Sequence, residues 1–174
     1  MFDAELSMRE HASRVAQVCF FHLRRLRPIR ARYIGRDVTL SLVTALVISR
    51  LDYCNCVLAG LPATTVAPLQ RVLHAAAGLV NGLRPHDHVT SALEELHWLP
   101  IKQRFDYKLC LLVHKATVRQ APSYLTGMLT ASLSTLRDAL NGNYAIPRTR
   151  PKFGERAFAV AAPVHGTACQ QNSS

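Results

Sequence analysis

The stretch LQRVLHAAAGLVNGL, residues 69–83, decides the fold class. Its apolar residues recur at the i, i+3, i+4, i+7 spacing of a helix that buries one face. The small residues at 75–78 predict that another helix approaches closely there. Thr64 or Thr65 is expected to cap this helix at its start, and Gly82 is expected to end it.

Two further helices are predicted upstream of this stretch. Residues 11–27 carry an apolar stripe, and Pro28 is expected to end that helix, with a basic turn following through Arg36. Asp37 is the expected N-cap of the next helix, over 38–58, whose wide apolar surface predicts a central, well-buried position.

Downstream, the chain continues in a helical pattern. Ser91 with Glu94 matches a capping box for a short helix. Pro100 suits the first position of a helix that is predicted to run from Ile101 to about Arg119. A last short helix is expected over 123–133.

These elements predict a mainly α fold, a single helical bundle of about five to six helices. The 174 residues suffice for one domain, and a hydrophobic content of 49% can supply its core. We expect a flexible N-terminus over 1–10 and a helical domain over 11–133. A loop and an extended segment are expected over 134–163, and a disordered tail over 164–174.

The sequence carries no obvious membrane or export signal. No apolar run reaches the roughly 18 residues that a membrane span needs, and no signal-peptide pattern opens the chain. An intracellular location, nucleus or cytoplasm, is expected, with no membrane partner. The five cysteines are odd in number and scattered, which favours buried free thiols over a disulfide framework.

Positive charge dominates the sequence and is unevenly distributed. The formal net charge is +10, and no Asp or Glu occurs between His11 and Arg36. A solvated basic surface would explain this excess, but arginine outnumbers lysine in these stretches and suits bidentate phosphate contact. The sequence therefore favours the RNA or DNA backbone as partner. The residues expected to contact phosphate are Arg24, Arg25, Arg27, Arg30 and Arg32, with Arg148, Arg150 and Lys152 as a second group.

The acidic residues do not predict a two-metal catalytic site. Glu94 and Glu95 are the only adjacent acidic pair, and neighbouring residues on a helix point about 100° apart. Asp52 stands alone. We therefore expect no catalytic residue, no metal and no cofactor.

Three weaker patterns leave alternatives open. The loop with His86, Asp87 and His88, with His97 not far along, could bind a metal, although a capped loop with surface histidines explains it more simply. Cys54 with Asp52 and a distant histidine could form a nucleophile set, but no spacing supports that. Trp98 could stack on a base or fill the core.

A set of ordered segments resembles the C-terminal region of reverse transcriptases from non-LTR (LINE-type, jockey-like) retrotransposons. The likeness runs from about residue 11 to 163, and its specificity lies in the order of the segments. They are CFFHLRRLRPIR at 19–30, SRLDYCN at 49–55, LAGLP at 58–62, LQRVLHAAA at 69–77, DHVT at 87–90, ELHWLPI at 95–101, YKLCLLVHKA at 107–116, APSYL at 121–125, PRTR at 147–150 and GERAFAVAAP at 154–163.

The resemblance implies a part of a polymerase that is not its catalytic centre. In that family the magnesium-binding aspartates lie in the palm, and the endonuclease lies further upstream. The region resembled here is the thumb and the helices after it. It implies helices that lie along the template–primer duplex, an RNA–DNA hybrid, and hold its backbone, with the palm as a further partner.

The sequence departs from the family pattern in three places. The AAP at 161–163 is followed by Val164-His165-Gly166 and a polar tail, where the family continues with a tryptophan-containing stretch. The segment between Leu129 and Tyr144 is short for the family, and the chain starts just past the expected palm. Two interpretations follow: a nucleic-acid-binding fragment without catalysis, or an inert folded remnant of a truncated element.

Overall fold

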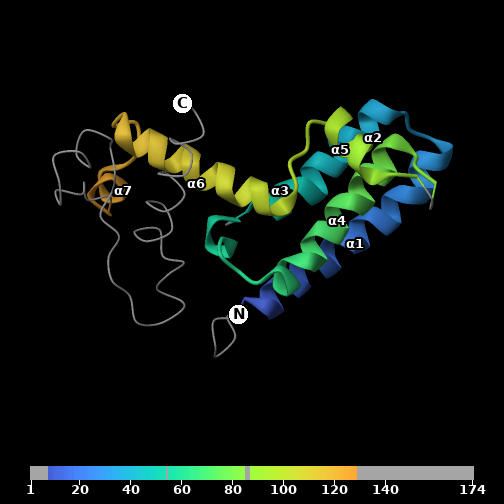
Figure 1. Ribbon diagram of the computed structural model, residues 1–174. Coiled ribbons are helices and arrows are strands. Elements are labelled where there is room, and N and C mark those ends of the chain that lie inside the picture. The colour runs from blue at the N-terminus through green and yellow to red at the C-terminus, as the bar shows by residue number, and fades with distance from the viewer. Residues whose placement is uncertain (1–7, 54, 85–86, 129–174) are drawn as a thin grey trace. The chain divides into compact units, whose positions relative to one another are not determined.

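The structure, a computed structural model, describes residues 8–53, 55–84 and 87–128, and every regular element in these ranges is helical (Figure 1). The mainly α class predicted from the sequence is confirmed. The segments expected over 134–163 and 164–174 lie outside the described residues. The α-helices are α1 (Arg9–Arg32), α2 (Arg36–Val43), α3 (Ser49–Asp52), α4 (Ala63–Asn81), α5 (Val89–Glu95), α6 (Ile101–Thr117) and α7 (Ser123–Met128). A π-helical turn, η1 (Thr44–Ile48), joins α2 to α3, and a 3-10 turn, η2 (Asn55–Leu58), follows α3.

The chain divides into two compact units. Among the described residues, the first unit contains 8–53 and the residues from Leu61 to Arg104. The second contains 55–60 and the residues from Phe105 onward. The boundary falls within α6, so the first turn of this helix belongs to one unit and the remainder to the other.

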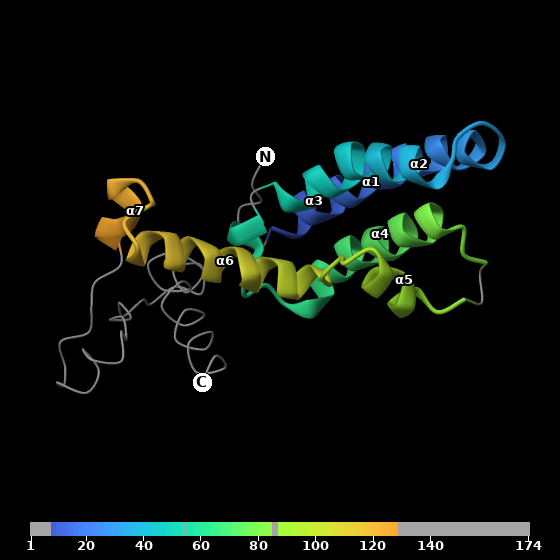
Figure 2. The same cartoon turned by 90° about the horizontal axis from the view of Figure 1, so that it is seen from above.

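The first unit is built on α1 and α4, which lie side by side (Figure 2). The stripe predicted over 69–83 is buried as expected: Leu69, Val72, Leu73, Ala76 and Val80 are each at most 1% exposed. The facing stripe of α1 is formed by Ala12, Ala16, Cys19, Leu23 and Leu26. Small residues occupy the first part of this stripe and leucines the second, so burial there depends on shape as well as on area.

Pro28 does not end the first helix, contrary to the prediction. The helix begins at Arg9, continues through Pro28 and ends at Arg32, and Tyr33 N–H still donates to Ile29 O at 2.8 Å. Proline removes the hydrogen bond to the carbonyl one turn earlier, that of Arg24. Arg24 and Pro28 are both exposed, so water can hydrate that carbonyl. The expected basic turn is therefore the last turn of α1.

The second predicted helix is shorter than expected and is interrupted. Gly35 is its N-cap, Asp37 lies inside the first turn, and the helical segment ends at Asp52. The five residues of η1 form a π-helical turn, which adds a residue to the turn and changes the direction of the side chains that follow. Its central position is partly confirmed, because Val43 and Val47 are fully buried.

The predicted side-chain caps of α4 and α5 are absent. Pro62 and His88 stand at the two N-cap positions, and neither helix has a side-chain cap hydrogen bond. Ser91 Oγ instead donates to His88 O at 3.1 Å, so the capping box with Glu94 does not form. The end of α4 is as predicted: Gly82 adopts a left-handed conformation, φ 69°, and Leu83 N–H donates to Gly78 O at 2.9 Å.

Helix α6 begins where predicted, and its first turn is tied to the first unit. Gln70 Oε1 accepts a hydrogen bond from Ile101 N–H at 2.9 Å, which satisfies one of the free donors at this helix start. The predicted inner residues Ile101, Phe105, Leu109, Val113 and Ala116 are buried, whereas Leu112 is only half-buried. Helix α7 confirms 123–128 of the last predicted helix, and the rest of that range lies outside the described residues.

The cysteines follow the prediction only in part. Cys19 is a free, fully buried thiol, whereas Cys110 is disulfide-bonded. An odd count of cysteines still allows pairs, and spacing along the sequence cannot show which side chains fold together. Within the described residues, no helix is long and apolar enough to span a membrane.

Burial makes Cys19 an unreactive thiol at neutral pH. Desolvation raises the pKa of Cys19 from 9.0 to about 11, and the charge of Arg50 opposes this rise. We expect iodoacetamide to label Cys19 far more slowly in the folded than in the unfolded chain, as measured by peptide mass spectrometry. Equal labelling rates in both states would contradict the burial.

The same pKa shift predicts a pH dependence of stability. The unfolded thiol ionises near pH 9.0 and the folded one near 11, so the protonated, folded form is favoured. The contribution of the protonated Cys19 thiol to the free energy of unfolding is fully present below pH 9.0 and is lost as the pH rises through about 11. Urea unfolding of the wild type and of Cys19→Ala at several pH values gives the free energy of unfolding of each. If the two free energies changed with pH in the same way, the prediction would be contradicted.

Candidate nucleic-acid interface

The exposed side of α1 carries four of the arginines predicted to contact phosphate. Arg24, Arg25, Arg27 and Arg32 are all exposed. Arg24 and Arg27 are one turn apart and share one flank, whereas Arg25 and Arg32 are two turns apart and share another. The described part of the chain places no carboxylate in an ion pair with any of these four. Their guanidinium groups are available to an anionic partner.

Arg14 extends one of these flanks. It is exposed, and helical periodicity places it on the same face as Arg25 and Arg32. From Arg14 to Arg32 this row, the arginine row, spans about 27 Å at 1.5 Å per residue. That length parallels about eight base-pair steps of 3.4 Å. A row of this kind suits a duplex backbone better than a single small anion.

An aromatic ring holds one member of the arginine row. The guanidinium carbon of Arg25 lies 4.8 Å from the centre of the Phe21 ring, and Phe21 is 46% exposed. A cation above a ring at this distance is attracted by the negative face of the ring. The contact limits the positions that Arg25 samples and leaves its outer edge to solvent.

Arg30 has a structural role and does not belong with the exposed arginines. Its Nη2 donates to Val80 O at 3.2 Å, near the end of α4, and its Nε is buried with no hydrogen-bond partner among the described residues. A positive charge at a helix C-terminus complements the helix dipole. Helical periodicity alone predicts this buried position. Arg30 lies one turn after Leu26 and two turns after Leu23, on the buried stripe.

Gly82 makes room for this arginine. A Cβ atom at Gly82 would lie 2.6 Å from Arg30 Nη2, and the left-handed backbone at this position also disfavours other residues. The glycine that ends α4 therefore allows the guanidinium from α1 to reach the end of the helix.

We expect Arg30→Met to lower stability without changing the salt dependence of nucleic-acid binding. Loss of the charged hydrogen bond to Val80 O should reduce the free energy of unfolding by about 1–2 kcal/mol. Arg27→Met, at an exposed position, is the matched control, with less than about 0.5 kcal/mol of lost stability. Gly82→Ala should destabilise to a similar extent as Arg30→Met. Urea unfolding gives the stabilities. The structural role of Arg30 would be contradicted if Arg30→Met changed only the salt dependence of nucleic-acid binding and left stability unchanged.

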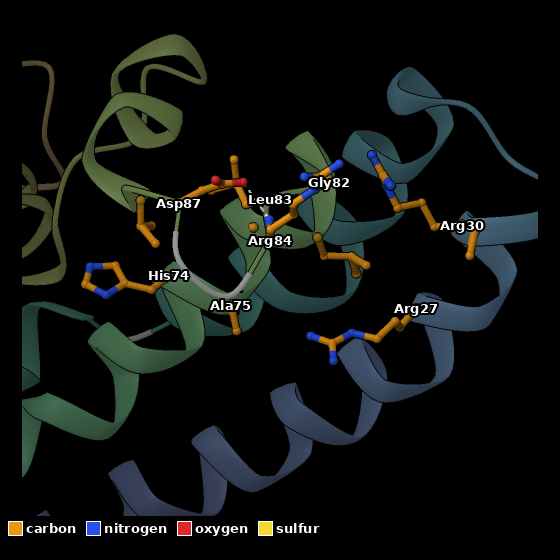
Figure 3. Close-up of a pocket in the computed structure, with 12 residues that line it drawn as sticks. Arg27, Arg30, His74, Ala75, Gly82, Leu83, Arg84 and Asp87 are labelled. Carbon is orange, nitrogen blue, oxygen red and sulfur yellow. Dashed lines mark hydrogen bonds between the residues drawn. The ribbon is translucent and has the colours of Figure 1, made fainter.

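A hollow of about 570 Å³ lies between α1 and the end of α4 (Figure 3). Arg27 and Arg30 come from α1, whereas His74, Gly82, Arg84 and Asp87 come from α4 and the residues after it. Asp87 Oδ2 accepts a hydrogen bond from the backbone N–H of Arg84 at 2.7 Å. Arg84 was not predicted as a site residue, because it is distant from the basic stretch in sequence and joins it only by folding.

The small residues of α4 lie partly in the core and partly beside this hollow. Ala76 and Ala77 are fully buried, but Ala75 and Gly78 line the hollow. A Cβ atom at Gly78 would meet only Leu83 Cβ, at 3.9 Å. No other described atom lies within 4 Å of that position outside the helix itself, and the missing side chain of Gly78 widens the hollow.

Two of the acidic residues considered for metal binding, Asp52 and Glu95, are held in ion pairs. Asp52 accepts two hydrogen bonds from Arg104, at 2.9 and 2.5 Å. Glu95 accepts from Arg36 at 2.6 Å and from Asn81 at 2.8 Å, which links the ends of α4 and α5 to the start of α2. These carboxylates neutralise Arg36 and Arg104, and no described carboxylate forms an ion pair with Arg24, Arg25, Arg27 or Arg32.

The described ranges contain no group of three or more His, Cys, Asp or Glu side chains that could hold a metal ion. Trp98 is half-buried, and its backbone N–H donates to Leu93 O at 2.8 Å, which places its backbone at the end of α5. His86 and Cys54 lie outside the described residues, as do Arg148, Arg150 and Lys152.

Comparison with protein-family models, with curated proteins and with solved structures gives no match to this chain.

Proposed function

We propose that the protein binds nucleic acid through its phosphate backbone, without catalysis, as a fragment that resembles the thumb of a retrotransposon reverse transcriptase. The observation that carries the proposal is the exposure of Arg24, Arg25, Arg27 and Arg32 on one helix, with no ion-pair partner among the described residues. The ordered segments that resemble the reverse transcriptases point to the same partner, a template–primer duplex.

The chemistry of the four arginines fits a partner with regularly spaced phosphates. Guanidinium groups bind phosphate oxygens with two parallel hydrogen bonds and carry no sequence information. The protein should therefore bind RNA–DNA hybrids of unrelated sequence with similar affinity. Arg30 contributes to this surface indirectly, because it holds the end of α4 beside it.

The salt dependence of binding tests the proposal. If four arginines each displace counterions from one phosphate, log affinity should fall with log salt with a slope of about −3 to −4. Affinity for a labelled RNA–DNA hybrid should then drop by about 100-fold between 50 and 200 mM salt. Fluorescence anisotropy of the titrated hybrid measures this slope. A slope near zero, from protein shown to be folded by circular dichroism, would contradict backbone binding.

The competing interpretation, an inert remnant, predicts a different outcome. A folded protein that binds no hybrid at low salt and aggregates as its concentration rises would support the remnant. Several large apolar side chains are exposed, among them Tyr33, Tyr107 and Tyr124, at 79%, 60% and 65%. Analytical ultracentrifugation over a range of concentrations separates the two interpretations.

A further inference from the structure

A second hollow, of about 540 Å³, lies between the first half of α1 and the end of α3. Four of its lining residues, His11, Arg14, Val15 and Val18, follow the spacing of one helical face. Arg50 and Tyr53 line it from the other side, just after the π-helical turn η1. All of these residues belong to the first unit.

The charge of this hollow selects an anion. Arg14 and Arg50 are exposed, His11 adds an imidazole ring, and none of the described residues that line the hollow is acidic. Asp52, the nearest acidic residue in sequence to Arg50, is held by Arg104. Two guanidinium groups with no described carboxylate in the lining favour a phosphate.

The apolar part of the hollow favours a ligand with a planar ring. Tyr53 is 71% exposed although its ring is largely apolar, and its backbone is extended after α3. Val15 and Val18 are half-buried and present methyl groups to the same space. A base can stack on an exposed aromatic side chain while its phosphate is held by cations beside it.

We propose that this hollow binds one unpaired nucleotide, with its base on Tyr53 and its phosphate between Arg14 and Arg50. The inference rests on the proposed function, because Arg14 also begins the arginine row with Arg25 and Arg32. A duplex held along that row would direct a single-stranded extension into the hollow. The volume of about 540 Å³ lies within the usual range of small-ligand sites.

The test compares hybrids that differ only at their end. Blunt RNA–DNA hybrids, and hybrids with a short single-stranded extension on either strand, are titrated at one salt concentration. The wild-type protein should bind one extended hybrid about tenfold more tightly than the blunt one. A hybrid whose extension has equal length but abasic sites carries the same charge, and the protein should bind it no more tightly than the blunt hybrid.

Variants assign the preference to the hollow. Tyr53→Leu should bind extended and blunt hybrids alike, whereas Tyr53→Phe keeps the ring and should keep the preference. Tyr107→Leu is the matched control, because Tyr107 is similarly exposed, at 60%, on α6. The proposal would be overturned if Tyr107→Leu lost the preference for the extended hybrid as fully as Tyr53→Leu, or if the wild type bound extended and blunt hybrids equally.

A separate measurement distinguishes failure of the nucleotide site from failure of duplex binding. Methyl NMR of Val15 and Val18 is recorded during titration of the full chain with the dinucleotide pApA. Shifts in the wild type that vanish in Tyr53→Leu support the hollow even if blunt hybrids do not bind. Displacement of the dinucleotide by an equal charge concentration of polyglutamate would show a general anion site and overturn the nucleotide assignment.

Discussion

Replacing Arg24, Arg25 and Arg27 by glutamine is expected to weaken binding of an RNA–DNA hybrid by about 100-fold at low salt. The three side chains are exposed on α1, so their loss should leave the helix and its buried stripe intact. Each phosphate contact contributes about 0.9 to the salt slope, so the slope should become shallower by about 2–3. Anisotropy titrations at several salt concentrations give both quantities.

A charge-matched control separates the arginines of α1 from the overall charge. Lys102, Lys108 and Lys115 are exposed on α6, and their replacement by glutamine removes the same number of positive charges. If general attraction to a basic protein explained binding, both triple variants would lose affinity equally. The proposal requires the loss to be concentrated in the α1 variant.

Leu73→Ala is expected to lower the free energy of unfolding by about 3 kcal/mol, the largest stability effect predicted for this chain. Leu73 is 0% exposed in the middle of α4, within the stripe that faces the core of the first unit. Its truncation removes buried methyl groups and leaves a cavity among rigid neighbours. Urea unfolding followed by far-ultraviolet circular dichroism measures the change.

Arg71→Ala is the control for Leu73→Ala on the same helix. Arg71 is exposed, so its truncation should change stability by less than about 0.5 kcal/mol. A loss of less than about 1 kcal/mol in Leu73→Ala would mean that α4 is not packed as described. Hybrid binding by folded Leu73→Ala should remain, because the arginine row lies on the outer side of α1.

Local signals in the sequence predicted the helices better than their ends. The apolar period of 69–83 and the stop at Gly82 are confirmed, because both depend on residues close together in the chain. Pro28 was expected to end α1, but the packing of Leu23 and Leu26 and the anchoring of Arg30 on α4 outweigh one lost hydrogen bond. The predicted side-chain caps of α4 and α5 were wrong, because Pro62 and His88 occupy the two N-cap positions.

The candidate site was predictable only in part. Exposure of Arg24, Arg25, Arg27 and Arg32 follows from helical periodicity once the buried stripe of α1 is known. The same periodicity assigns Arg30 to the buried side, a signal that the count of basic residues alone obscures. Arg84 and Tyr53 join these groups through pairing of distant segments, which no local pattern specifies.

The sequence by itself determined the helical class, the buried stripes and the excess of arginine on α1, because these depend on periodicity and composition. Only the tertiary structure decided which arginines remain available: Arg30 holds the end of α4, Arg36 binds Glu95 and Arg104 binds Asp52. Such pairings join residues that lie far apart in the chain. The partly buried Arg30 needs its partner because a polar group near the core is stable only when it is hydrogen-bonded. The exposed Arg36 and Glu95 pair because folding brings the two side chains together.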